Sequence, residues 1–211
     1  MPSEPKQSIP TKCDHCHRQM SEVVVCDYCH ALSPSGLMTD YFTLLGLPRH
    51  YDLDEDDLRQ KFFALNRHAH PDQHGGESPE VQQLSLALSA AINDAYRTLK
   101  DPASRGAYLL ELLGGQSSAG DKSVPENLLN TVMMMQEELV DAKSAGDAAA
   151  VARIRETMTN QHDGLLRRVA TLFSQIEDAS ACQAIRSDLL SEIRKQLNAI
   201  SYVKKLLSQA G

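Results

Sequence analysis

The stretch LRQKFFALNRHAHPD, at residues 58–72, contains the pattern that decides the fold. Its apolar residues advance by four, three and four positions, so they fall on one face of a helix: Leu58, Phe62, Leu65 and Ala69. The acidic run at 54–57 suits a helix N-terminus, and Pro71 disfavours helical geometry in the residue before it. The stretch therefore predicts an amphipathic helix that ends at an exposed His-Pro-Asp turn.

Helical patterns also fill the chain on the C-terminal side of this stretch. One helix is predicted from Pro79 to the Asp101-Pro102 pair, and a short one continues from there to Leu112. Three longer patterns follow at 125–145, 148–179 and 182–209, and the short turns between them favour an antiparallel three-helix bundle. Sustained apolar/polar alternation is missing beyond the cysteine-rich N-terminus. The predicted fold class is therefore all-α, with the bundle at the C-terminal end.

The composition separates the chain of 211 residues into four segments. Residues 1–36 hold four of the five cysteines, residues 37–114 carry most of the net charge of −7, and a Gly/Ser-rich stretch at 115–124 predicts a linker before residues 125–211. The acidic excess argues against general binding to nucleic acid or to a membrane surface, and no apolar run reaches the roughly 18–20 residues that span a bilayer. Residues 1–9 resemble neither a secretion nor an import signal, so the expected location is the cytoplasm, or the mitochondrial matrix if the chain is eukaryotic.

Cysteine spacing in the first segment predicts a metal site. Two CxxC units separated by nine residues supply four sulfur ligands: Cys13, Cys16, Cys26 and Cys29. Four thiolates in a tetrahedron suit one structural Zn²⁺ per chain, and reduced iron also fits. We expect a small zinc ribbon or knuckle with a short strand at 21–25, and we expect metal loss to unfold only this segment. The alternative is four unpaired thiols.

Histidines flank the two CxxC units, and one cysteine lies far from them. His15, His17 and His30 could each replace a ligand, but a complete set of four thiolates makes them unnecessary. Cys182 is predicted to be a small buried apolar residue on a helix.

Several motifs occur in a fixed order around the His-Pro-Asp turn. DYFTLLGL at 40–47 precedes the first helix, INDAYRTL at 92–99 closes the next, and a D-P-x-x-R-x-x-Y pattern follows at 101–108. In this order the motifs resemble the J domain of DnaJ-type co-chaperones. RGAYLLELLG at 105–114, the three-helix C-terminal region and the cysteine block followed by ALSP at 31–34 narrow the resemblance to the HscB/Jac-type co-chaperones of iron–sulfur cluster assembly. The resemblance implies a J-domain helical hairpin within residues 37–114.

In that family the J domain docks on an HscA/DnaK-type ATPase chaperone and stimulates its ATP hydrolysis. The resemblance assigns this contact to His70, Pro71, Asp72, Arg59, Lys61 and Arg67. Helix positions 60, 63, 64 and 67 face away from the apolar stripe, so the pattern also places Arg67 in solvent and Lys61 at the border of the stripe. Each cation could instead belong to an ordinary solvated face. Ala69 and Gln73 depart from the family pattern, which has a bulkier residue and a lysine there.

The first bundle helix has more apolar residues than its core stripe needs. That stripe consists of Leu128, Val132, Met135, Leu139 and Ala142. Leu129, Met133 and Met134 are left over, and they indicate either an interaction site or a wider core stripe. The resemblance implies that an IscU-type iron–sulfur scaffold protein binds at Leu129, Asn130, Met133, Met134, Glu137, Asp141 and Tyr202. Asn130 and Met134 depart from the methionine and glutamate usual in the family.

These features predict a co-chaperone and not an enzyme. It would hold the scaffold through the bundle, deliver it to the chaperone, and stimulate the chaperone's ATPase through the His-Pro-Asp loop. A J-domain co-chaperone of general protein folding is the first alternative, and a zinc-ribbon nucleic-acid-binding protein is the second, which the acidic balance disfavours. A catalytic role of His70 is disfavoured as well, because no nucleophile motif or Gly-rich phosphate loop accompanies it.

Overall fold

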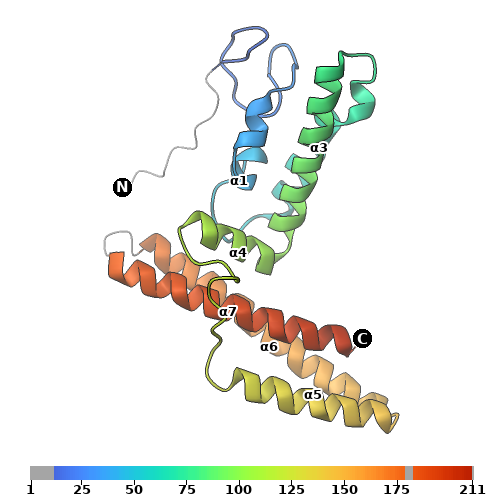
Figure 1. Ribbon diagram of the computed structural model, residues 1–211, viewed down its shortest axis with the longest axis vertical. Coiled ribbons are helices and arrows are strands. Elements are labelled where there is room, and N and C mark those ends of the chain that lie inside the picture. Colours follow the sequence, from blue (N-terminus) through green and yellow to red (C-terminus); the bar gives the residue numbers. More distant parts are fainter. Residues whose placement is uncertain (1–11, 179–182, 211) are drawn as a thin grey trace. The chain divides into compact units, whose positions relative to one another are not determined.

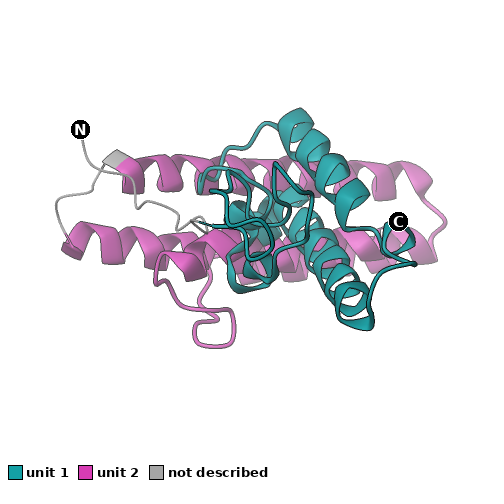
Figure 2. Cartoon of the chain, turned by 90° about the horizontal axis from the view of Figure 1, so that it is seen from above, with its two compact units in different colours: residues 1–105 teal, residues 106–211 magenta. Residues whose placement is uncertain are grey.

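The computed structural model describes residues 12–178 and 183–210, and within them every regular element is a helix (Figure 1). The chain divides into two compact units, unit 1 (Met1–Arg105) and unit 2 (Gly106–Gly211), which Figure 2 colours separately. The predicted all-α class is confirmed. Among the described helices, none combines the length and the apolar character needed to cross a membrane.

The predicted strand at 21–25 is wrong except at its last residue. In the described part of the chain, β-type pairing consists of one antiparallel bridge between Val25 and Leu32. Val23 and Val24 are almost completely buried. Their side chains are used for packing, so the β-branched run forms bends inside a core and not one strand of a sheet.

Unit 1 contains a helical hairpin formed by α2 (Glu55–Ala69) and α3 (Pro79–Lys100). Phe62 stacks on Tyr96 with ring centroids 4.1 Å apart, and Ser85 Oγ donates a hydrogen bond of 2.8 Å to Ala69 O. Because these contacts occur in opposite order along the two helices, the helices are antiparallel. The face predicted for the core is buried, as the sequence spacing required: Leu58, Phe62, Leu65 and Ala69.

The D-P-x-x-R pattern at 101–105 forms the joint between α3 and α4 (Pro102–Leu112). Asp101 Oδ1 accepts a hydrogen bond of 2.9 Å from the N–H of Ala103 and so caps the start of α4. Arg105 Nη1 donates a bond of 2.8 Å to Leu99 O at the end of α3, and its guanidinium lies 5.2 Å from the centroid of the Tyr51 ring. These motif residues therefore serve the fold.

The cysteine-bearing segment packs into unit 1 through its valines and through one glycine. Gly36 lies in a short 3-10 helix, η1 (Pro34–Met38), just before α1 (Tyr41–Leu44). A Cβ atom at Gly36 would lie 3.1 Å from Leu88, 3.2 Å from Leu44 and 3.3 Å from Val24, so a larger residue would push these side chains apart. The segment and the hairpin therefore share one core. We now expect metal loss to destabilise the hairpin as well, and not to unfold the first segment alone.

Unit 2 holds the predicted three-helix bundle, formed by α5 (Leu128–Ser144), α6 (Ala148–Asp178) and α7 (Gln183–Gln209). One buried cluster joins all three helices: Leu128, Val132, Leu139, Ala142, Ala150, Ile154, Met158, Ala199, Val203, Leu206 and Ala210. α5 begins later than predicted because Asn127 takes a left-handed backbone conformation, with φ of 66°. The helix ends predicted at residues 179 and 182, and Cys182 itself, lie outside the described residues.

The Gly/Ser-rich segment before α5 is tied to α7 by two buried polar side chains. Arg194 Nε donates a hydrogen bond of 2.7 Å to Gln116 O. Asn198 Nδ2 donates bonds of 2.9 Å to the carbonyl oxygens of Asp121 and Ser123. These carbonyl oxygens accept hydrogen bonds from buried side-chain donors that have no access to water. The division into four segments stays a prediction, but this segment is anchored within unit 2.

Candidate functional site

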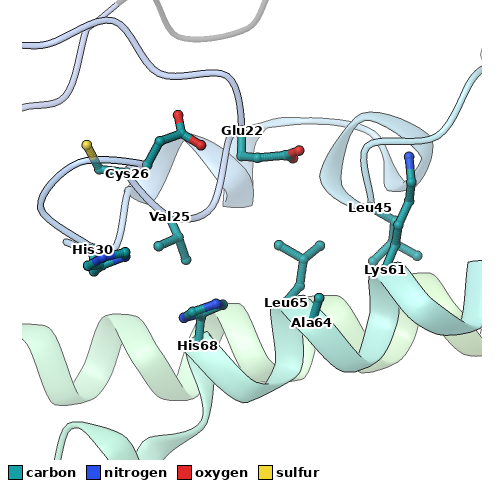
Figure 3. A pocket seen from close by; sticks show the side chains of 10 residues that line it. Glu22, Val25, Cys26, His30, Leu45, Lys61, Ala64, Leu65 and His68 are labelled. Carbon is teal, nitrogen blue, oxygen red and sulfur yellow. The ribbon is translucent and has the colours of Figure 1, made fainter.

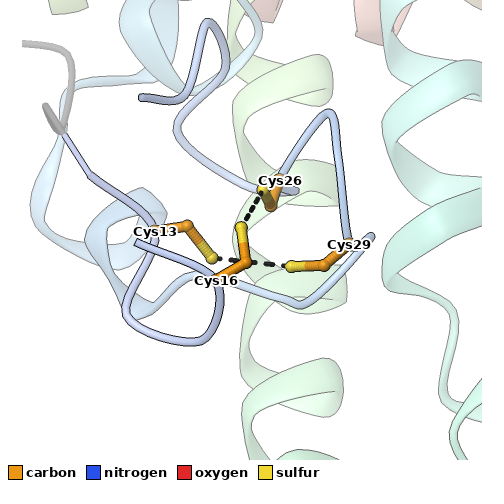
Figure 4. A group of neighbouring side chains, drawn as sticks. All are labelled: Cys13, Cys16, Cys26 and Cys29. Carbon is orange, nitrogen blue, oxygen red and sulfur yellow. Dashed lines mark hydrogen bonds between the residues drawn. The ribbon is translucent and has the colours of Figure 1, made fainter. Parts of the chain in front are cut away.

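Four sulfur atoms converge in the N-terminal part of unit 1 (Figure 4). The Sγ atoms of Cys13, Cys16, Cys26 and Cys29 all lie within 4.8 Å of one another. The pairs Cys13–Cys29 and Cys16–Cys26, one sulfur from each CxxC unit, are 3.6 Å apart. Four thiolates at about 2.3 Å from a tetrahedral ion are roughly 3.8 Å from one another. The cluster therefore fits a single four-coordinate metal ion and leaves no open position for substrate.

The two CxxC units have the same backbone geometry. His17 N–H donates to Cys13 O over 2.9 Å, and His30 N–H donates to Cys26 O over 3.0 Å. Both histidines have φ of 58°, a left-handed conformation that histidine adopts more readily than most residues. Each histidine therefore occupies the left-handed position that closes its CxxC turn. The metal-ligating group found among the described residues consists of the four cysteines without a histidine.

The cluster gives its sulfur atoms unequal acidity. Backbone hydrogen bonds from Cys29 and Tyr28 lower the pKa of the Cys26 thiol to about 7. At Cys29 a backbone hydrogen bond from Ala31 acts in the same direction, but burial and the other three sulfurs raise the pKa of that thiol to about 12. Four thiolates this close repel one another unless a cation lies between them. The arrangement therefore favours a bound divalent ion.

The His-Pro-Asp turn lies at the C-terminal end of α2. His70 ends the helix, and residues Pro71–Gln73 form one 3-10 turn, η2. Asp72 N–H donates to His70 Nδ1 over 3.2 Å, so this nitrogen uses its lone pair and the Nε2–H edge of the ring remains available. Both side chains are exposed. The turn therefore exposes the imidazole of His70 and the carboxylate of Asp72 to solvent, and the bond from the Asp72 backbone holds the orientation of the imidazole.

The three cations assigned to chaperone docking do not share one face of α2. Arg59 and Arg67 are exposed and lie on the solvent face, and Arg59 pairs with Asp56 over 2.9 Å. Lys61 is about 200° around the helix from Arg59, at 3.6 residues per turn. Its Nζ donates to Gly46 O and lies 3.7 Å from Asp57 Oδ2. The structure thus brings Arg59 and Arg67 to one surface and directs Lys61 to another.

Lys61 lies at a cleft of about 350 Å³ between the cysteine-bearing segment and α2 (Figure 3). Val25, Leu65 and Glu22 line it, and His30 from the segment lies beside His68 from α2. Figure 3 shows the two imidazole rings parallel; their centroids are 6.3 Å apart and their planes differ by 4°. The cysteine-bearing segment and the helix that carries the His-Pro-Asp turn therefore line the same cleft.

The residues assigned to scaffold binding form an exposed face of α5. Six of them are exposed: Leu129, Asn130, Met133, Met134, Glu137 and Asp141. Met133 is 60% exposed and Met134 is 70% exposed, so neither belongs to a widened core stripe. Tyr202 is also exposed on α7, beside Val203, which belongs to the buried cluster that contains Val132.

Two of the exposed apolar residues that the sequence interpretation missed lie on the helices assigned to binding. Val140 is seven positions after Met133 and eleven after Leu129, so all three fall within about 40° on the surface of α5. Phe63, on α2, occupies a position that the helical pattern already placed away from the core. The signal for each was a large apolar residue at a helix position outside the core stripe.

Family models cover most of the chain. Residues 40–108 match the DnaJ domain, and residues 124–210 match the HSCB C-terminal oligomerisation domain. The co-chaperone protein HscB of Proteus mirabilis is 31% identical over 164 residues, which cover 75% of this chain and 93% of that protein. An HscB homolog of Neisseria meningitidis is 30% identical over 165 residues, which cover 77% of this chain and 99% of the homolog.

Solved structures agree with these matches. The crystal structure of human co-chaperone protein HscB aligns with a TM-score of 0.78 at 25% identity, over 94% of this chain and 96% of the human one. Chaperone HscB from Vibrio cholerae aligns with a TM-score of 0.68 at 28% identity, over 82% of this chain and 95% of that chain.

Proposed function

The chain belongs to the HscB family of J-domain co-chaperones, and on this premise we propose that it joins an iron–sulfur scaffold protein to an ATPase chaperone. Unit 2 holds an IscU-type scaffold, unit 1 docks on an HscA/DnaK-type chaperone, and hydrolysis of ATP takes place on the chaperone. The chain itself performs no chemistry. The observation that carries the proposal is that each unit exposes a surface of its own, the His-Pro-Asp turn in one and the apolar α5 face in the other.

On unit 1 we assign chaperone docking to His70, Pro71, Asp72, Arg59 and Arg67. The two exposed arginines suit an acidic partner surface, because opposite charges steer association and select the partner. Lys61 acts differently: its ammonium group is held by the Gly46 carbonyl, so it positions α2 against the loop before it. The proposal therefore treats Lys61 as a positioning residue.

The four-cysteine site is proposed to hold Zn²⁺ as a structural ion. Cys13, Cys16, Cys26 and Cys29 would bind it, and the ion would supply cross-linking of the two CxxC units, with no catalytic step. This role fits a segment whose valines are buried.

On unit 2 we assign scaffold binding to the α5 face with Tyr202. The apolar part consists of Leu129, Met133, Met134 and Val140, and the polar part of Asn130, Glu137 and Asp141 adjoins it. Exposed apolar side chains rimmed by carboxylates are typical of interaction sites. Methionine, which is flexible and polarisable, suits such a surface.

The double change Leu129→Ala with Met133→Ala tests this surface. Both side chains are exposed, so we expect the free energy of unfolding to change by less than about 1 kcal/mol per site, as at most surface positions. The dissociation constant for the scaffold should rise at least tenfold, which corresponds to roughly 1.4 kcal/mol of lost binding energy. Thermal melting and isothermal titration with the purified scaffold measure the two quantities.

The control is Ile185→Ala, an exposed apolar truncation about 25 Å along α7 from Tyr202 at 1.5 Å per residue. It should leave scaffold binding unchanged. A clear loss of melting temperature with normal binding in the double variant would show that the two residues stabilise the bundle and do not bind. Basal ATPase stimulation without scaffold should remain normal in both variants.

A further inference from the structure

Phe63 is the exposed aromatic side chain on the solvent face of α2, with 59% of its surface open. Arg59 and Arg67 lie one helical turn before and after it. His70 follows seven positions later, which is two turns, about 10 Å along the axis, and within about 20° of the same face. Phe63 therefore lies in line with the His-Pro-Asp turn, between the two docking arginines.

The packing of unit 1 does not account for Phe63. The core face of α2 is complete with Leu58, Phe62, Leu65 and Ala69, all of which are buried. Phe63 meets that core at Phe62: the two ring centroids are 5.2 Å apart and the planes are tilted by 55°. Because Phe62 is in turn stacked on Tyr96, the contact restrains the Phe63 ring while leaving most of it in solvent.

A restrained, exposed aromatic ring between two arginines has the chemistry of a binding anchor. Aromatic residues and arginine dominate the energetic centres of interfaces, since they bury large areas at low cost in conformational entropy. We propose that Phe63 is the apolar anchor with which α2 docks on the ATPase chaperone, and that it inserts into an apolar hollow flanked by carboxylates that meet Arg59 and Arg67. This inference rests on the proposed function. It adds that the chaperone must have an apolar hollow that receives Phe63.

The flanking charges favour this occupant over a second copy of the chain. Self-pairing of the face about a two-fold axis would bring Arg59 and Arg67 of one copy toward the same cations of the other, which is unfavourable. An acidic partner avoids this repulsion. Its contact would also be continuous with the His-Pro-Asp turn, which lies on the same side of α2.

The proposal has a distinctive salt dependence. Between roughly 0.1 M and roughly 1 M salt, the screening length falls from about 10 Å to about 3 Å, so the contributions of Arg59 and Arg67 to docking decrease. The contribution of Phe63 comes from apolar burial and should persist. Arg59→Gln and Arg67→Gln should therefore weaken docking mainly at low salt, and Phe63→Gln at both salt concentrations.

The experiment is a titration of chaperone ATPase stimulation under single-turnover conditions. Phe63→Gln should raise the half-maximal co-chaperone concentration at least tenfold with little change in melting temperature, and Phe63→Leu should recover most of the loss. Leu86→Gln is the matched control, because Leu86 is 63% exposed on α3 of the same unit and outside the α2 face. It should behave as the unchanged protein. Normal stimulation by Phe63→Gln would overturn the inference.

A second measurement does not depend on a substitution. Hydroxyl-radical labelling of the unchanged protein, read by mass spectrometry, should show Phe63 protected when the ATP-bound chaperone is added and Leu86 equally labelled with and without it. Equal labelling of Phe63 with and without the chaperone would overturn the inference even if Phe63→Gln were unstable. His70→Gln, included in parallel, separates the two proposals: if it stimulates normally, the docking function itself fails, and if it is silent while Phe63 is unprotected, the anchor alone fails.

Discussion

A chain carrying His70→Gln is expected to lose all stimulation of its partner chaperone's ATP hydrolysis while keeping its helical signal and its scaffold affinity. His70 is exposed and lies outside both cores, so the substitution should change the free energy of unfolding little. Its ring accepts the Asp72 N–H at Nδ1 and presents Nε2–H outward, and a glutamine side chain reproduces this rigid two-edged arrangement poorly. Stimulation should therefore be lost because the turn no longer docks in the correct geometry, and not because the chain unfolds.

The measurement is single-turnover ATP hydrolysis by the chaperone at saturating co-chaperone, beside circular dichroism and scaffold titration. His74→Gln is the control, since His74 is four residues away and its ring nitrogen is bonded to His68 O, a contact that an amide also makes. It should stimulate normally. Undiminished stimulation by His70→Gln would contradict the assignment of the J-domain surface.

Replacing Cys13 and Cys16 by serine should remove the metal and lower the thermal stability of unit 1. A structural Zn²⁺ site uses four protein ligands, so the loss of two thiolates should abolish it. The binding free energy of Zn²⁺ that is lost with it reaches roughly 10–16 kcal/mol in small peptides. The effect should extend beyond the first segment, because Gly36 lies close to Val24 of the segment, Leu88 of the hairpin and Leu44 of α1. Purified protein is expected to contain one Zn²⁺ per chain and the variant none.

Mass-spectrometric metal analysis and differential scanning calorimetry check this expectation. Cys182→Ser, which leaves the four clustered sulfurs in place, is the control and should retain its metal. We expect a lower transition for unit 1, with unit 2 and scaffold binding unaffected. If the variant loses its metal and unit 1 melts as before, the segment is an appendage and the shared core contributes little.

The sequence was sufficient for the boundaries of α2, α3 and α4 because they depend on local signals. Asp54 caps α2, Pro71 ends it, and Asp101 with Pro102 separates α3 from α4, all within a few residues of the helix ends. The strand at 21–25 failed for the opposite reason. β-Branched residues favour both strands and buried bends, and only contacts with residues such as Leu88, far along the chain, decide between them.

The candidate sites were predictable to different degrees. Cysteine spacing alone gave the sulfur set, since a CxxC unit determines local geometry. The α5 face was predicted as two alternatives, because a helical pattern cannot tell a wide core stripe from an exposed one, and the burial of each residue was needed. The family resemblance assigned Lys61 to docking, and its bond to Gly46, fifteen residues earlier in the chain, could not be predicted from the helical pattern.

The shared core around Gly36 also sets an order of events during synthesis. The two CxxC units lie close together in sequence and can enclose an ion as soon as Cys29 has left the ribosome. Leu88, which lies against Gly36, is made about sixty residues later, or roughly 3–12 s at about 5–20 residues per second. The ion is therefore expected to be captured first, on the nascent chain. In a cell short of that metal, the segment that carries the valines would still be unfolded when α3 is synthesised. The core of unit 1 would then have to form without a prefolded partner for α3.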